Sequence, residues 1–199
     1  MLQAFHICPV CKLPGFREQK LCRHCAIDLR GHRQPTVRAG GNFTVRSLFA
    51  WDRHSPPGLS DLVYSLKGIE ESQAWIELAL WMVQKFSFKL EKPVLVPVPG
   101  PRPNHAYGLA AALSRALGHP VRDALVSCAS RRQKALGREE RSEVQFALRA
   151  GHLCTDYKCV IIVDDVVTTG ATADAAYRAL LRPKNCEVWC LMDRRPCGP

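Results

Sequence analysis

The chain has 199 residues, a formal net charge of +10 and 47% hydrophobic residues. This length allows one full α/β domain with a small appendage. No stretch reaches the roughly 18 apolar residues of a membrane-spanning helix, and no signal-peptide layout opens the chain, so we expect a cytoplasmic protein, with the inner face of the cytoplasmic membrane as the alternative location. The positive charge favours polyanionic partners, and ordinary solubility charge is the competing explanation.

Two cysteine pairs mark the first segment of the chain, Cys8-x2-Cys11 and Cys22-x2-Cys25. Two intervening residues let both thiolates of a pair reach one ion, and two pairs complete a closed tetrahedral Zn²⁺ site. Residues 1–35 are poor in aliphatic side chains, so we expect structural zinc to hold them as a module, with 36–199 as the main domain. Loss of the metal should then unfold the module and spare the rest. The neighbouring His6 and His24 are interpreted as bystanders.

Periodicity predicts the elements of the first half of the main domain. Arg30 to Arg38 reads as a linker, because Gly31 and Pro35 interrupt it. An alternating strand of a hairpin follows, with one apolar face made of Phe43, Val45, Ser47, Phe49 and Trp51. We then expect a helix from near Asp61, capped by Ser60, and a longer helix from Glu71 to Phe86. On the longer helix the apolar face comprises Trp75, Leu78, Ala79 and Met82.

In the second half, strands again alternate with helices. The expected strands are Val94–Val96, Val121–Val126, Tyr157–Val163 and Glu187–Met192, and the expected helices are Ala106–Leu117 and Ala171–Leu181. Pro97 and Pro99 should prevent normal pairing, which makes the segment up to Arg102 a shaped loop. Arg131 to Arg141 reads as an exposed, mobile basic loop. This order predicts an α/β fold, a mostly parallel sheet flanked by helices.

The strand over Tyr157–Val163 leads into two adjacent acids and a hydroxyl-rich loop. Asp164 and Asp165 follow the apolar run, and the next residues are Thr168, Thr169, Gly170, Ala171 and Thr172. Carboxylates accept hydrogen bonds from vicinal ribose hydroxyls, and backbone N–H groups at a helix N-terminus bind phosphate. The pattern therefore predicts a sugar-phosphate site. A strand end, a turn and a threonine-capped helix form the simpler alternative.

Val160 to Thr172 resembles the motif with which type I phosphoribosyltransferases bind 5-phosphoribosyl-1-pyrophosphate (PRPP). The resemblance implies the fold of that family. It also implies that Asp164 and Asp165 bind the ribose hydroxyls, that Thr168 to Thr172 bind the 5′-phosphate, and that Mg²⁺ accompanies PRPP. In that family a loop after an earlier strand binds pyrophosphate, and residues 98–102 hold the matching position here. Because proline lacks an N–H donor, Gly100 and Arg102 are the expected anion contacts of this loop.

The whole arrangement also resembles the ComF family of competence proteins. The resemblance rests on the four cysteines, a Pro-Val-Pro loop, the C-terminal motif and shorter matches at Tyr64-x-Leu66-Lys67, Asn104-His105, Gln133-x-x-Leu136 and Arg141. The chain departs from that family at Gly68, at Arg102-Pro103 and at Val144. The resemblance implies a role in natural transformation, with single-stranded DNA and other competence proteins such as a DNA translocase as partners. A homo-oligomer is a further open expectation.

The basic loop has three interpretations. Its cations, among them Arg132 and Lys134, could close over the pyrophosphate, lie along a nucleic-acid backbone, or be a solvated charge run interspersed with acids. No catalytic residue is predicted: His105 and His119 are the histidines that could act as bases, but a helix-capping or surface role suits each better. Two functions therefore stay open, a phosphoribosyl-ligand protein acting in DNA uptake and an active phosphoribosyltransferase of nucleotide metabolism.

Overall fold

A computed structural model describes residues 6–8, 10–11, 14–15, 21–31, 35–39, 41–52, 55, 57–66, 73–86, 91–100, 105–128, 145–151 and 157–194. The strands are β1 (His6–Ile7), β2 (Pro14–Gly15), β3 (Thr36–Ala39), β4 (Thr44–Trp51), β5 (Pro93–Pro97), β6 (Leu125–Ser127), β7 (Phe146–Leu148), β8 (Cys159–Val167) and β9 (Cys186–Arg194). The helices are α1 (Arg23–Gly31), α2 (Pro57–Leu66), α3 (Gln73–Lys85), α4 (His105–Leu117) and α5 (Ala171–Ala179).

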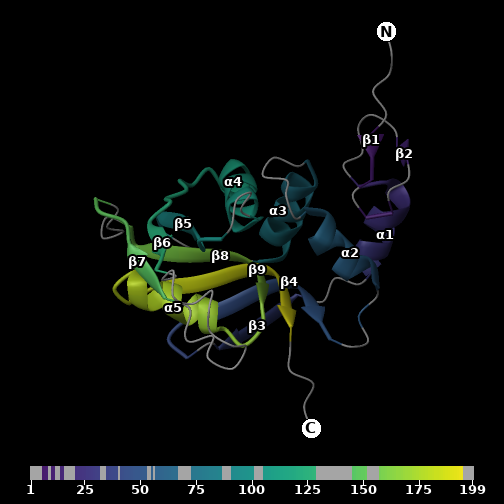
Figure 1. The fold of residues 1–199 in the computed structure, drawn as a ribbon. Coiled ribbons are helices and arrows are strands. Elements are labelled where there is room, and N and C mark those ends of the chain that lie inside the picture. Colours follow the sequence, from purple (N-terminus) through teal and green to yellow (C-terminus); the bar gives the residue numbers. More distant parts are fainter. Residues whose placement is uncertain are drawn as a thin grey trace.

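A five-stranded sheet in the order β3-β4-β9-β8-β5 organises the molecule. The four strands β4, β9, β8 and β5 are parallel, and only β3 runs antiparallel, at one edge. Helices α3 and α4 lie over one face of the sheet and α5 lies under the other (Figure 1). The fold is therefore the mostly parallel sheet flanked by helices that the sequence predicts.

Each face of the sheet has its own apolar layer. The layer on the α3 and α4 side includes Trp75, Leu78, Ala79 and Met82, which confirms the predicted face of α3. The layer on the α5 side includes Ala173, Ala176 and Tyr177 together with alternate residues of the central strands. Because β8 and β9 are covered on both sides, their sequences are nearly continuous apolar runs rather than alternating ones.

The predicted hairpin exists, since β3 pairs antiparallel with β4, but two details of the prediction are wrong. Leu48 and Phe49 are adjacent and both fully buried, so β4 does not have a single apolar face. The cause is its parallel pairing with β9 inside the sheet, which leaves both of its faces covered. The predicted linker is also shorter than Arg30–Arg38, because its first residues belong to α1 and its last to β3.

Two prolines occupy regular secondary structure where we did not expect it. Pro97 remains in the sheet, in register with Val163 of β8, although we predicted that it would prevent pairing. Strand β5 is the edge of the sheet, where a missing N–H is tolerated. Helix α2 begins at Pro57 rather than near Asp61, because proline suits the first turn of a helix.

The remaining differences concern short strands. Of the predicted strand Val121–Val126, Val121 makes only an isolated bridge to Leu95, and the regular part is β6, which pairs antiparallel with β7. The basic loop Arg131–Arg141 lies outside the described residues. Helix α5 and the last strand, β9, both lie within a few residues of their predicted positions.

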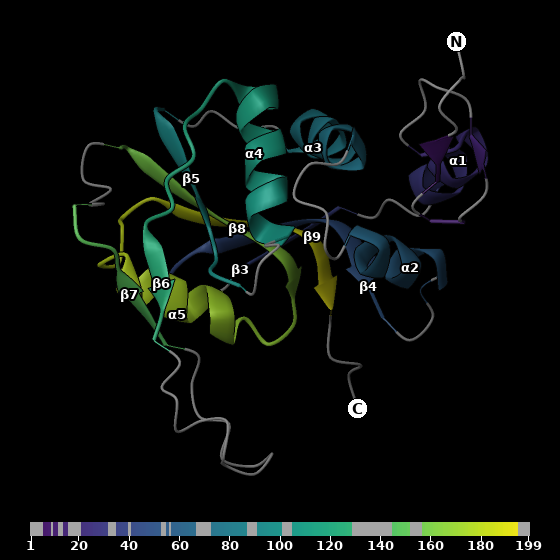
Figure 2. The ribbon, with the colours of Figure 1, turned by 45° about the horizontal axis from the view of Figure 1, so that its top comes forward.

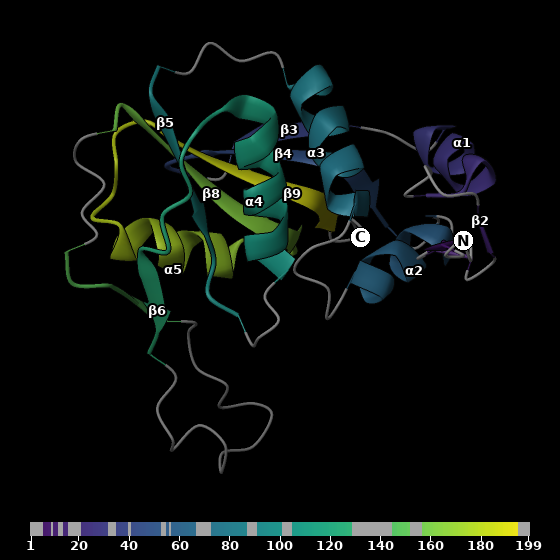
Figure 3. The same cartoon turned by 90° about the horizontal axis from the view of Figure 1, so that it is seen from above.

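The N-terminal unit, formed by β1, β2 and α1, lies beside α2 (Figure 3). Its apolar side chains Leu21, Ala26 and Leu29 are buried in the same layer as Leu59 and Leu62 of α2. The unit is therefore attached to the main domain through a shared core. Within the part of the chain that is described, no helix has the combination of length and apolarity that crossing a bilayer requires.

Candidate functional site

The connections of two neighbouring strands create a topological switch point. Strand β5 leads into α4 on one face of the sheet, whereas its neighbour β8 leads into α5 on the opposite face (Figure 2). In open parallel sheets, ligands bind in the crevice outside the carboxyl ends of such a pair of strands. The predicted acids and the threonine-rich loop lie at the carboxyl end of β8, which is where this rule places a ligand.

The central strand is longer than the sequence suggested. We predicted its end at Val163, but β8 continues through both acids to Val167. The extension is explained by β9, because Asp164 pairs in register with Cys190 and Val166 with Met192. The two acids are thus held on a rigid strand rather than on the loop that follows it.

The two carboxylates differ in exposure. Asp165 faces α4, because its Oδ2 lies 3.2 Å from the ring of His105 at the start of that helix, and its side chain is 23% exposed. Asp164 is only 6% exposed. Strict alternation of side chains along the strand ends before Val166, because Val163 and Val166 both pack in the layer of α3 and α4.

Three hydrogen bonds fix these acids. The Asp165 N–H donates to Oδ1 of Asp164 at 2.9 Å, and the Val166 N–H donates to Oδ1 of Asp165 at 2.9 Å. The second oxygen of Asp165, Oδ2, lies 3.2 Å from Nδ1 of His105, the first residue of α4. Burial raises the pKa of the Asp164 carboxyl well above its usual range, and repulsion by the adjacent Asp165 adds to the effect.

The loop after β8 presents its hydroxyl-bearing residues at the surface. Thr168 and Thr169 are exposed, and the Ala171 N–H donates to Oγ1 of Thr169 at 3.3 Å. Gly170 is the N-cap of α5 and has φ of 88°, a left-handed conformation that glycine adopts without steric cost. Gly170 has no side chain with which to cap the helix, but Thr169 just before it accepts from the first N–H of α5, so the simpler alternative of a threonine at the helix start is partly what the loop forms. The N–H groups of a first helical turn can also bind an anion.

The residues predicted for pyrophosphate are only partly described. Gly100 is exposed and lies just beyond β5, near the point where the Val98 N–H donates to the Val163 carbonyl at 3.0 Å. Arg102, Arg132 and Lys134 lie outside the described residues. The strand order nevertheless puts the end of β5 and the end of β8 at the same edge of the sheet.

Comparison with protein families decides the assignment. The model of the phosphoribosyl transferase domain matches residues 66–197, which is more than half of the chain. The chain belongs to the phosphoribosyl transferase domain family. None of the curated proteins compared with the chain matches it significantly.

Two residues of this phosphoribosyl transferase domain were missed by sequence reasoning. His105 was interpreted as a capping or surface residue, yet its ring lies against Asp165, 60 residues further along the chain. Local periodicity carries no signal for a contact of that separation. Asp193 lies one residue beyond the predicted last strand and is 1% exposed, in register with Val167. Its signal was an acid at the end of an apolar run, the same signal that identified Asp164.

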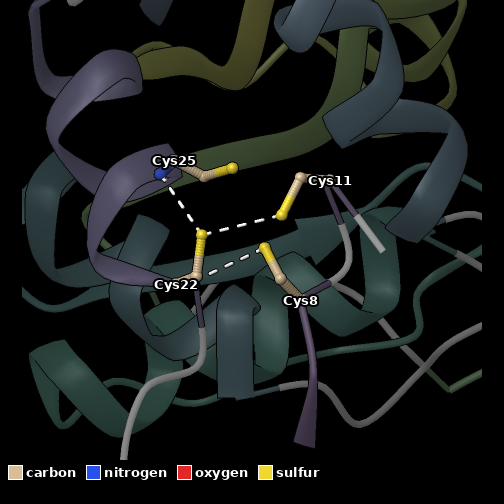
Figure 4. Close-up of side chains that lie close together, drawn as sticks. All are labelled: Cys8, Cys11, Cys22 and Cys25. Atoms are coloured by element: carbon tan, nitrogen blue, oxygen red, sulfur yellow. Dashed lines mark hydrogen bonds between the residues drawn. The ribbon is translucent and has the colours of Figure 1, made fainter. Parts of the chain in front are cut away.

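The four predicted zinc ligands converge at the N-terminal side of the phosphoribosyl transferase domain, before the segment that the family model covers. Their Sγ atoms all lie within 4.8 Å of one another (Figure 4). Cys11 and Cys22 have sulfurs 3.7 Å apart, close to the ~3.8 Å edge of a tetrahedron with Zn–S bonds of about 2.3 Å. The donor set therefore fits a closed zinc site, and no other group of three or more such ligands occurs among the described residues.

Backbone N–H groups also point at these thiols. The Cys22 N–H donates to Sγ of Cys8 at 3.4 Å, and the Cys25 N–H donates to Sγ of Cys22 at 3.4 Å. Burial raises the pKa of the Cys8 thiol, but the N–H groups of Cys22, Cys11 and Val10 outweigh burial and lower this pKa to about 7. Such donors favour the thiolate, which is the form that binds metal. Cys159 and Cys190, predicted as small buried hydrophobes, are buried as expected.

Proposed function

We propose that the chain binds PRPP or a related 5-phosphoribosyl ligand at the edge of the sheet between β5 and β8. The observation that supports this most directly is the succession of paired acids, hydroxyl-rich loop and helix N-terminus at a topological switch point. A phosphorylated pentose needs both kinds of contact, acceptors for its hydroxyls and donors for its phosphate. The proposed phosphate contacts are Thr168, Thr169, Gly170, Ala171 and Thr172.

The two acids contribute unequally to this proposal. Asp165 is the accessible carboxylate and accepts hydrogen bonds from the ribose hydroxyls directly. Asp164 is the second proposed acceptor, but because this residue is only 6% exposed it contributes less to ribose binding.

At the other end of the ligand, the proposed pyrophosphate contacts are Gly100, Arg102, Arg132 and Lys134. Mg²⁺ would accompany PRPP and neutralise part of its pyrophosphate charge; oxygen ligands of the kind found here suit that ion.

A calorimetric titration of PRPP with Mg²⁺ tests the site. We expect the parent chain to bind, and the double variant Asp164→Asn, Asp165→Asn to lose affinity by at least about thirtyfold, or roughly 2 kcal/mol, because charge-assisted hydrogen bonds are the strong ones. Of the single variants, Asp165→Asn should lose more affinity than Asp164→Asn. Asp61→Asn, an exposed acid of α2, is the matched control. Unchanged binding by the double variant would show that the acids are not the site.

We also propose that this binding serves the handling of single-stranded DNA in natural transformation, the role of ComF-like proteins. Two observations favour it: the cysteine cluster joined to a phosphoribosyl transferase domain, and the net charge of +10. In this role the zinc unit of residues 1–35 is the surface that meets other competence proteins, such as a DNA translocase. The alternative is turnover, in which the ribose 5-phosphate moves to a nitrogen base and pyrophosphate leaves.

Salt dependence separates DNA binding from the PRPP site. With a labelled oligothymidylate and fluorescence anisotropy, we expect the dissociation constant to rise at least about tenfold between 50 and 200 mM salt, because each phosphate contact releases a counterion. The PRPP affinity should change much less, since its site is local. Absence of any DNA binding at 50 mM salt, together with pyrophosphate release from PRPP in the presence of bases, would favour turnover instead.

A further inference from the structure

The start of α4 contributes a residue to the acid-bearing end of β8. Nδ1 of His105 lies 3.2 Å from Oδ2 of Asp165, and the two side chains are 21% and 23% exposed. We infer that His105 is a positioning residue of the 5-phosphoribosyl site, acting by orienting the Asp165 carboxylate. The inference rests on the proposed function. It adds to the proposed site a residue of α4, the helix that follows β5, whereas the two acids lie on β8.

The direction of this hydrogen bond follows from its chemistry. A carboxylate has only acceptor sites, so the proton belongs to Nδ1 of His105. The Val166 N–H already holds Oδ1 of Asp165, and His105 holds Oδ2, so both oxygens of this carboxylate are fixed. Each oxygen can accept more than one hydrogen bond. The carboxylate is therefore oriented without losing its capacity to accept a ribose hydroxyl.

The helix that carries His105 is well anchored. The next residue, Ala106, is 3% exposed, and Leu109 and Ala110 are fully buried against the sheet. An imidazole at the first position of such a helix has a defined place relative to β8. Without the ring, Asp165 keeps one hydrogen bond and regains rotation about its side-chain torsions, and ligand binding must then supply the ordering.

Substitutions at position 105 test the inference through binding. In the calorimetric titration of PRPP with Mg²⁺, we expect His105→Ala to weaken binding about tenfold, since hydrogen bonds to charged groups are among the stronger ones. His105→Asn should recover most of the affinity, because its amide nitrogen falls near the position of Nδ1. His105→Gln should not, because its amide reaches the position of Nε2. His119→Ala, two residues beyond the end of α4, is the matched control.

A spectroscopic measurement on the free protein tests the contact itself. Long-range ¹H–¹⁵N spectra of the imidazoles should show His105 in the Nδ1–H tautomer, and Asp165→Ala should remove that preference. This result does not depend on any ligand. If the parent binds PRPP but His105→Ala binds equally well, or if His105 is the Nε2–H tautomer, the positioning role is wrong while the site stands. If the parent does not bind PRPP, the proposed function fails instead, and the tautomer still reports on the contact.

Discussion

Asp164 is a costly residue for the folded protein. Its carboxyl is buried, its neighbour Asp165 carries the same charge, and its pKa is raised well above the usual range, first by burial and then by that neighbour. A side chain that lowers stability in this way is typical of functional sites, where local destabilisation is retained for binding. Asp164 thus links the stability of the fold to the ligand proposed for it.

The raised pKa predicts how stability depends on pH at this residue. Between the unfolded pKa of about 3.9 and the higher folded pKa, the folded protein binds the Asp164 proton more tightly, so this residue lowers the free energy of unfolding as pH rises through that window. We expect Asp164→Asn to be more stable than the parent at pH 7 by on the order of 1 kcal/mol, because the amide keeps the acceptor for the Asp165 N–H and removes one of two adjacent charges.

Urea unfolding of both proteins at several pH values measures this effect. The difference between variant and parent should be present at pH 7 and shrink as pH falls, levelling off below about pH 3, where the carboxyl is protonated in both states. The exposed Asp61→Asn serves as the control and should show no such trend. An Asp164→Asn protein less stable than the parent at every pH would mean that the ionised carboxylate has a stabilising partner.

At the scale of elements, the periodicity of the chain predicted most of the long strands and helices. The apolar face of α3, the position of α4 and the hairpin of β3 and β4 all follow from local spacing, because each depends on residues within one or two turns or strands. The cysteine spacing likewise predicted that four sulfurs converge, since a tight turn fixes each pair. These features are encoded locally.

Features that depend on the pairing or packing of neighbouring elements could not be predicted from local spacing. Strand β8 extends past Val163 because β9 pairs beside it, and Pro97 stays in the sheet because β5 is an edge. The acids were predicted at the correct end of the correct strand, but their place within the strand rather than after it follows from that extension. The contact between His105 and Asp165 joins α4 to β8, and only the topology of the sheet brings them together.

At the scale of the whole molecule, the cysteine unit and the phosphoribosyl transferase domain share one apolar layer. Leu21 and Leu29 are 2% and 1% exposed, and they are buried with Leu59, Leu62 and Leu66 of α2. The guanidinium of Arg30 also lies 5.0 Å from the ring centroid of Trp81 on α3, and it contacts Glu77 at 3.5 Å. A metal bound at the cysteines would therefore hold in place part of the core that covers α2.

This shared layer changes the expected result of removing the metal. Purified protein should contain about one Zn²⁺ per chain, and a strong chelator should remove amide-exchange protection from α1 and also from α2, whose apolar partners Leu21 and Leu29 would be released. Protection in α5 should persist, because the apolar layer around this helix contains none of the described residues of the N-terminal unit. Leu29→Ala should cost about 2–5 kcal/mol and weaken α2 in the same way with zinc still bound. Loss of protection confined to α1 would instead mean that the cysteine unit folds independently of the domain it covers.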